Sequence, residues 1–401
     1  KFEKENEYIM THEGILKESL NFIINMVSND KITFNKIHLD LILKFIKSYS
    51  DRVDFGNVEK ELFSNKDISL YSLNSLGGRY VRTLLELALK IKRIDMPGYQ
   101  LYWEQNIKSI MEFLMHNSSI DCYVLLGEYI SNFSYIDEKW IEDIIKDTTP
   151  QHEMWQYFIT GYLDSRTVYY KFYALMGKNY LTALEYKNFD EKDIKEKIGI
   201  HILVGYINGF EEDTGIQLMS KLLEIWDEEI LEVVIRHCFN IEEKQLATGV
   251  ERSDVESRIL KLWNELINKC SSEDLNSDLK NIELIKDSIG LINNFSIINE
   301  SIVKNLTFAF KYVSNSFEVH DVVDYCERLI NSNQAYPTKL ITSLVFELFN
   351  QCIPSYPEET IKKLLDYLRD NNEFESLNQI LHTYVRLTKK SFVVNYISKF
   401  S

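Results

Sequence analysis

The eight histidines are the side chains of this sequence best suited to bind a metal ion or to move a proton near neutral pH. The segment HEMWQ at residues 152–156 begins like a helical zinc motif, in which two histidines four positions apart bind the metal and a glutamate acts as base. Gln156 stands where the second histidine is needed. We therefore predict no metal site at His152.

Two further neighbouring pairs could carry chemistry. His320 and Asp321 resemble the His–Asp pair of helical phosphohydrolases, but that chemistry needs more histidines and aspartates around two metal ions. His237 precedes Cys238, yet adjacent positions on a helix point about 100° apart, which disfavours activation of the thiol by the ring. No G-x-S-x-G nucleophile motif is present. The sequence predicts no catalytic residue, no cofactor-binding residue, no metal ligand and no cofactor.

Gly77 and Gly78 raise the question of a phosphate-binding loop. Such a loop needs Lys and Ser or Thr directly after its last glycine, and here Arg79 and Tyr80 follow. From Arg79 onwards the pattern is that of an amphipathic helix. We therefore predict a loop that ends in the two glycines, followed by a helix whose Glu86 pairs with Arg82 and Lys90 on an exposed face.

Acidic side chains gather at residues 210–215 (FEEDTG) and 226–230 (WDEEI). Carboxylates are stabilised at the positive N-terminal end of a helix. Both clusters therefore predict helix starts rather than catalytic carboxylates.

The elements that would position these residues are predicted to be helices. Only 14 of the 401 residues are glycine and 5 are proline, far fewer than tight turns between strands require. Apolar stripes at helical spacing recur along most of the chain. The first two such stripes comprise Ile15, Leu16, Leu20, Ile23 and Ile24, and then Ile37, Leu41, Ile42, Phe45 and Ile46. We predict an all-α chain of antiparallel helix pairs.

Repetition is clearest in the C-terminal third, where similar stripes start at Ile302, Leu340 and Leu377. A two-helix unit of about 40 residues is typical of HEAT- or armadillo-like α-solenoids. Breaks near Pro97 and at residues 270–278 divide the chain only weakly. We predict a continuous superhelix with subdomains at residues 1–95, 96–273 and 274–401.

Composition limits the class of partner. A net charge of −16 disfavours nucleic-acid binding, because a binder must neutralise phosphates. No apolar run reaches the length of a membrane span.

Five scattered cysteines indicate reduced, buried thiols and a cytoplasmic protein. The chain begins with Lys1 rather than Met, so we expect a piece of a longer protein.

Several segments resemble a known family. Residues 71–87 (YSLNSLGGRYVRTLLEL) resemble the N-H-P-x-G-[KR]-x-x-E-[AT]-L-L segment in the C-terminal helical region of large bacterial antiphage-defence proteins. Those proteins carry an N-terminal sirtuin-like NAD-cleaving domain or a STAND-type NTPase. Ser75 and Leu76 replace the family's His-Pro. The segments that are similar to later parts of that region are residues 102–115, 137–144, 155–163 and 255–270, and the helical repeats after Asp278. The resemblance covers most of the chain from about residue 50.

The resemblance implies a non-catalytic scaffold or sensor that binds a phage or host protein and controls an upstream effector, with no catalytic residue carried over. Oligomerisation through the full-length protein stays open, as does the identity of the bound protein. Two alternatives also stay open, a helical-repeat regulator that senses peptides and a helical hydrolase whose site has no recognisable motif.

Overall fold

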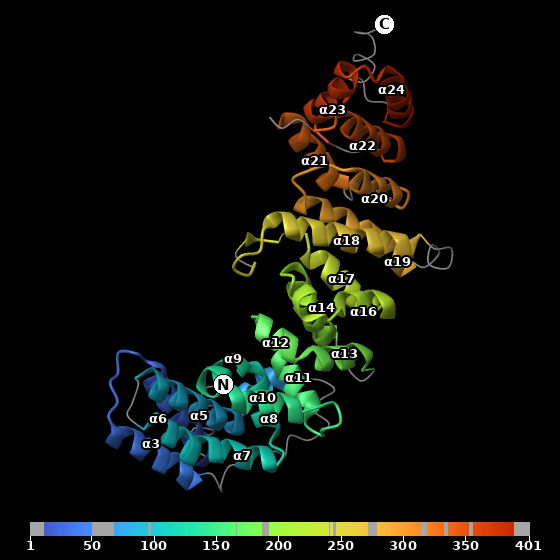
Figure 1. The fold of residues 1–401 in the computed structure, drawn as a ribbon. Coiled ribbons are helices and arrows are strands. Elements are labelled where there is room, and N and C mark those ends of the chain that lie inside the picture. The colour runs from blue at the N-terminus through green and yellow to red at the C-terminus, as the bar shows by residue number, and fades with distance from the viewer. Residues whose placement is uncertain are drawn as a thin grey trace. The chain divides into compact units, whose positions relative to one another are not determined.

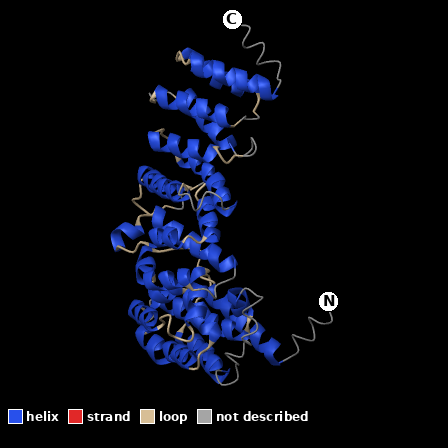
Figure 2. Cartoon of the chain, turned by 90° about the vertical axis from the view of Figure 1, so that its right-hand side faces the viewer, coloured by secondary structure: helices blue, strands red, loops and turns tan. Residues whose placement is uncertain are grey.

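The computed structural model describes residues 12–49, 68–94, 98–165, 167–186, 192–239, 241–243, 246–271, 279–313, 319–332, 336–352 and 356–388. These residues form helices and connecting loops with no strand among them (Figure 2), which confirms the predicted all-α class. Within the same ranges, no helix is both long and apolar enough to cross a lipid bilayer.

The chain divides into two compact units, unit 1 (Lys1–Phe189) and unit 2 (Asp190–Ser401). This division differs from the predicted borders after residues 95 and 273, which fall inside the units. Pro97 and residues 272–278, where breaks were predicted, lie outside the described residues.

The described residues of unit 1 form α-helices (Figure 1) and the π-helical segment η3. Its elements are α2 (His12–Ser28), α3 (Lys36–Tyr49), α4 (Ile68–Asn74), α5 (Leu76–Arg93), α6 (Tyr99–Tyr102), η3 (Trp103–Lys108), α7 (Ser109–His116), α8 (Ile120–Glu128), α9 (Ile130–Ile136), α10 (Glu138–Asp147), α11 (Trp155–Leu163), α12 (Tyr170–Leu175) and α13 (Gly177–Glu185).

Helix α5 is central to unit 1, because it packs against α2, α4, α8 and α9. The start of α5 differs from the sequence-based prediction of a loop that ends in Gly77 and Gly78. Residues 68–74 are helical, Ser75 caps α5 by accepting a hydrogen bond from the Gly78 amide (2.8 Å), and both glycines lie in the first turn. A Cβ on Gly78 would lie 1.7 Å from the carbonyl oxygen of Ser72. The glycines therefore allow two helices to meet closely, a packing role that their turn-forming tendency does not reveal.

A second close approach joins α8 and α11. A Cβ on Gly127 would lie 2.2 Å from the Phe158 carbonyl oxygen, and one on Gly161 would lie 1.9 Å from that of Val124. Nothing larger than glycine fits at either position unless the helices separate. All residues of α8 from Ile120 to Gly127 are buried as a result.

The predicted apolar stripes at the start of unit 1 are too wide. Ile15, Ile37 and Leu41 are 57%, 68% and 61% exposed. Helix α2 instead turns a narrower face, which includes Leu16 and Leu20, towards its contact with α5. Periodicity alone overestimated the buried width, because it does not show how much of a helix its neighbours cover.

The predicted exposed pairing of Glu86 with Lys90 is also wrong. Lys90 is only 3% exposed, and its Nζ donates to the backbone oxygen of Asn29 (2.9 Å), just beyond the end of α2. Asp30 lies 3.9 Å from the same nitrogen. A cation is favoured at the negative end of a helix, so Lys90 joins α5 to α2.

The described residues of unit 2 form α-helices (Figure 1) and the 3-10 segment η5. Its elements are α14 (Lys192–Ile207), α15 (Phe210–Thr214), α16 (Leu218–Ile225), α17 (Glu228–His237), α18 (Arg252–Cys270), α19 (Leu279–Asp287), η5 (Ser288–Asn294), α20 (Glu300–Phe310), α21 (His320–Asn331), α22 (Thr338–Gln351), α23 (Glu358–Asp370) and α24 (Phe374–Thr388).

The helices of unit 2 contact each other in two series. In one series α18 packs on α20, α20 on α22 and α22 on α24; in the other, η5 packs on α21 and α21 on α23. The three predicted stripe starts, Ile302, Leu340 and Leu377, lie on α20, α22 and α24, which contact each other in that order.

Two smaller predictions are confirmed. The acidic clusters do lie at helix starts, where Asp227 caps α17 and residues 211–213 occupy the first turn of α15. All five cysteines are free and buried.

Candidate functional site

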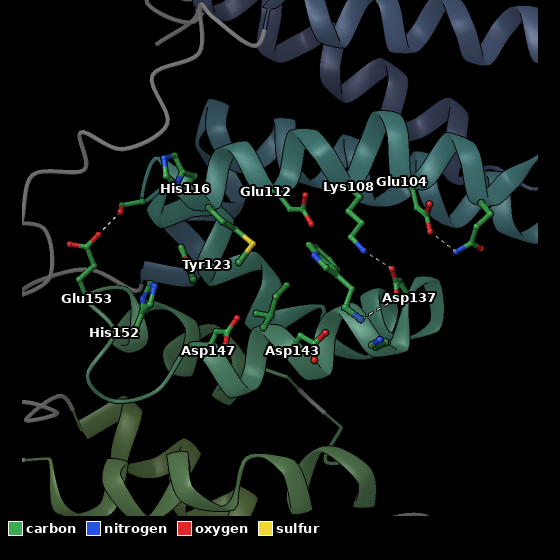
Figure 3. Close-up of a pocket in the computed structure, with 16 residues that line it drawn as sticks. Glu104, Lys108, Glu112, His116, Tyr123, Asp137, Asp143, Asp147, His152 and Glu153 are labelled. Carbon is green, nitrogen blue, oxygen red and sulfur yellow. Dashed lines mark hydrogen bonds and ion pairs between the residues drawn. The ribbon is translucent and has the colours of Figure 1, made fainter.

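A groove with a volume of about 890 Å³ lies in unit 1 between η3–α7 on one side and α10 with its following turn on the other (Figure 3). We call it the acidic groove, because its lining includes six carboxylates but only two lysines. These charged residues are Glu104, Glu112, Asp137, Asp143, Asp147, Glu153, Lys108 and Lys139.

The first wall is a row of side chains at every fourth position, Glu104, Lys108, Glu112 and His116, which Figure 3 shows along the same helical wall of the groove. In an α-helix, side chains four residues apart point in slightly different directions, because one turn takes 3.6 residues and four residues exceed a full turn. One turn of the wider π-helix takes more than four residues, so four residues fall short of a full turn and the direction shifts the opposite way. The π-helical segment η3 therefore helps to keep this row on one face.

The opposite wall comes from α10. Its apolar side buries Trp140 and Ile144 at the groove, and its polar side exposes Asp143 and Asp147. Such a two-sided helix places an apolar floor beside a charged rim.

Asp137 joins the two walls. One of its carboxylate oxygens accepts hydrogen bonds from Trp103 Nε1 (2.9 Å) and Lys108 Nζ (3.2 Å), and the other accepts from the Trp140 amide (3.0 Å) as the cap of α10. Partial burial acts to raise the pKa of Asp137, but the bonds from Trp103, Trp140 and Lys108 hold it below its ordinary value. Asp137 is therefore an ionised structural group that already has a cation.

Other carboxylates of the groove lack such a partner. Among the residues that the structure describes, no cation pairs with Glu112 or Asp147, and Asp143 has only the exposed Lys146 at 3.8 Å. All three carboxylates are exposed to water. The groove therefore holds negative charge that the described residues of unit 1 leave largely uncompensated.

Tyr123 lies at the His152 end of the groove and is 3% exposed. Its ring lies 5.4 Å from that of His152, and its hydroxyl has no hydrogen-bond partner in the described part of the chain. Burial, the nearby Cys122 thiol and the charges of Glu153 and Asp147 raise the pKa of Tyr123 to about 12. The phenol thus stays protonated at neutral pH and can both donate and accept a hydrogen bond.

The histidines weighed from the sequence do not converge. His152 lines the groove, but Gln156, four residues on, donates to the Tyr186 hydroxyl. His320 lies against the ring of Tyr356 at 4.8 Å in unit 2. Among the described residues, no three His, Cys, Asp or Glu side chains are arranged to hold a metal ion.

His237 and Cys238 point apart, as their adjacent helix positions predicted. The ring of His237 is exposed and its Nδ1 lies 2.9 Å from the Val233 oxygen, whereas Cys238 is completely buried. Burial also raises the pKa of the Cys238 thiol to about 12, so it is not an activated nucleophile.

Sequence reasoning named no residue of the groove as a site. The available signal was the spacing Glu104, Lys108, Glu112 and His116, together with a second helix that carries Asp143 and Asp147. Neither pattern alone distinguishes a groove wall from an ordinary solvated helix face, because the distinction depends on the two helices facing each other.

No protein-family model, curated protein or solved structure was found to match this chain.

Proposed function

We propose that this chain is a non-catalytic protein-binding region in which antiparallel helix pairs stack as a HEAT- or armadillo-like α-solenoid. We further propose that it is the scaffold or sensor part of a multidomain bacterial antiphage-defence protein in the cytoplasm, where it binds a phage or host protein and so controls an upstream effector. The resemblance of residues 71–87 and of the later segments supports the defence role.

The acidic groove is the observation that carries the binding role. Its two walls are helices, and its charged side chains Glu112, Asp143 and Asp147 reach into water instead of converging on one buried point. Carboxylates that act in catalysis are usually desolvated and have shifted pKa values. Exposed charges along an open groove are better suited to complement the surface of another protein.

The order of contacts in unit 2 supports the stacked architecture. Helix α22 packs on both α20 and α24, while α21 packs on α23, so successive helix pairs contact their neighbours in sequence. Solenoids of this kind bind proteins over extended surfaces.

The test is direct binding by the purified 401-residue chain. Proteins captured from bacteria before and after phage infection are identified, produced separately and titrated against the chain by calorimetry. We expect one phage protein to bind with a stoichiometry near one. If no purified phage protein binds, across phages of several unrelated types, the sensor role is wrong.

A further inference from the structure

We propose that the acidic groove binds an extended, lysine- and arginine-rich segment of the partner protein. This inference rests on the proposed protein-binding function and adds the chemical class of the bound segment. It follows from three observations on unit 1: the largely uncompensated carboxylates, the phenol that lines the groove without a hydrogen-bond partner among the described residues, and the dimensions of the groove.

The charges of the groove determine that the bound segment must be positively charged. Lys108 is already bonded to Asp137, and Lys139, the other lysine of the lining, forms no ion pair with Glu112 or Asp147 among the described residues. Glu112 on one wall and Asp147 on the other, together with Asp143, whose only cation in the described part of the chain is the exposed Lys146, therefore attract cations from both sides. Phosphates or acidic peptides would be repelled from the same surface.

Tyr123 adds a specific hydrogen-bonding group. Its side chain is almost completely buried, its hydroxyl has no hydrogen-bond partner among the described residues, and the residue lines the groove. The hydroxyl oxygen itself stays accessible to water in the groove, where a ligand can replace that water. A peptide backbone in the groove would supply one, since the phenol can donate to a carbonyl or accept from an amide.

The groove also fits an extended chain in length and lining. Its first wall runs from Gln100 to His116, which spans about 24 Å at 1.5 Å per residue. An extended segment of about seven residues covers this length. Trp140 lies in the floor, and its indole ring can hold the stem of a lysine or face an arginine guanidinium.

The experiment uses the complete chain and a fluorescent ten-residue peptide in which Lys and Arg alternate with Ser. Fluorescence anisotropy gives Kd for the wild type, for the groove variant Glu112→Gln/Asp143→Asn/Asp147→Asn, and for Tyr123→Phe. The matched control is Glu13→Gln/Glu18→Gln/Glu185→Gln, which removes three exposed carboxylates of unit 1 outside the groove. A peptide with Glu and Asp in place of Lys and Arg, and the polyamine spermine, are titrated in parallel.

We expect the basic peptide to bind the wild type and the control equally. The groove variant should bind about tenfold more weakly, and Tyr123→Phe about fivefold more weakly. Because the Tyr123 hydroxyl has no hydrogen-bond partner in the described part of the chain, the Phe variant should keep its fold, and circular dichroism checks this. The Kd should also rise with sodium chloride concentration, since these charges are exposed.

Three results would overturn the inference: equal binding by the groove variant and the control, equal binding of the acidic peptide, or tighter binding of spermine than of the peptide. Different results would contradict the proposed sensor function. If a purified phage protein binds the groove variant with unchanged Kd, protein binding stands and the groove assignment is wrong. If the basic peptide depends on the groove but no phage protein binds the chain, the assignment stands and the sensor role is wrong.

Discussion

Unit 1 and unit 2 both contain a charged hollow, but they compensate its charge differently. The hollow of unit 2, about 540 Å³ beside α17 and α19, carries internal ion pairs. Lys195 lies 2.8 Å from Glu229, Arg236 lies 2.7 Å from Glu232 and 3.3 Å from Asp287, and Lys280 lies 3.7 Å from Glu228. In the acidic groove of unit 1, Glu112 and Asp147 have no such cation among the described residues. Charges compensated within a unit are less available to a partner.

The two units also differ in how their helices approach each other. In unit 1, Gly78, Gly127 and Gly161 face backbone carbonyl oxygens of a neighbouring helix. In unit 2, the nearest atom to an added Cβ is a side-chain atom at each glycine with a close neighbour: Ile230 at Gly199, Arg258 at Gly209 and Phe239 at Gly290. The nearest backbone oxygen at Gly199, that of Ile230, lies at 3.3 Å. A side chain can rotate away from an added methyl group, whereas a helix backbone cannot, so unit 1 should be less tolerant of substitution at these positions.

The largest expected effect tests the series of contacts in unit 2. Leu344 is completely buried on α22, the helix that packs on both α20 and α24. Leu344→Ala should lower the free energy of unfolding of unit 2 by about 3–4 kcal/mol, because it leaves a cavity. Hydrogen exchange should speed up in α20, α22 and α24 and stay unchanged in α5. The control is Ser343→Ala, at an exposed position on the same helix. Equally faster hydrogen exchange in α5 would show that the effect of the cavity is not confined to the contact series of unit 2.

The next largest effect tests the close helix approach in unit 1. Gly161→Ala places a methyl group against the Val124 carbonyl oxygen and should cost about 2–3 kcal/mol. Gly199→Ala is the matched change in unit 2, where the nearest atom is a side-chain methyl of Ile230 at 3.2 Å. We expect the second change to cost less than about 1 kcal/mol, because alanine also favours the helix. Thermal unfolding measures both, and similar losses would remove the proposed difference between the units.

Buried Asp121 gives unit 1 a pH dependence. Burial raises its pKa to about 6 from 3.8, against the opposing effect of the Ser75 and Ser72 hydroxyls. A raised folded-state pKa means that the folded chain binds the proton more tightly. The resulting stability is therefore fully present below pH 3.8 and is lost as pH rises through about 6, by about 3 kcal/mol.

Asp121→Asn should consequently stabilise the chain at pH 7.5 and have little effect at pH 4. Denaturant titrations at both pH values measure this difference. The control is Asp147→Asn, which changes an exposed aspartate of the same unit. An equal gain at both pH values would show that the charge of Asp121 is not its cause.

The smallest effect compares two similar helix caps. Asp137 caps α10 and lies 3.2 Å from Lys108, while Asp227 caps α17 and lies 3.1 Å from Lys195. Only Asp137 also accepts the indole hydrogen of Trp103. Asp227→Ala should cost about 1 kcal/mol and Asp137→Ala about 2 kcal/mol, since the latter also leaves the indole unpaired. Equal costs in urea titrations would mean that the Trp103 bond adds nothing.

Local rules were reliable where a helix end or an apolar face is decided by nearby residues. Asp227 is a cap because its carboxylate reaches the amides two and three positions on, and that relation is visible in the sequence. The same local view failed at Gly77 and Gly78, since glycine is favoured both in turns and at close helix contacts. It also placed Lys90 on an exposed face, because the carbonyl oxygen that Lys90 binds lies 61 positions away.

The sequence by itself determined the helical class, the positions of Ile302, Leu340 and Leu377 on helices that contact each other in order, and the burial of the five cysteines, because apolar spacing and scarce turn residues act over short stretches. The acidic groove was decided only by tertiary structure. Its two walls are separate helices, and which of their carboxylates keep an unpaired charge depends on how η3, α7 and α10 face each other. Only that packing leaves Asp137 bonded to Lys108 while Glu112 and Asp147 stay exposed to water.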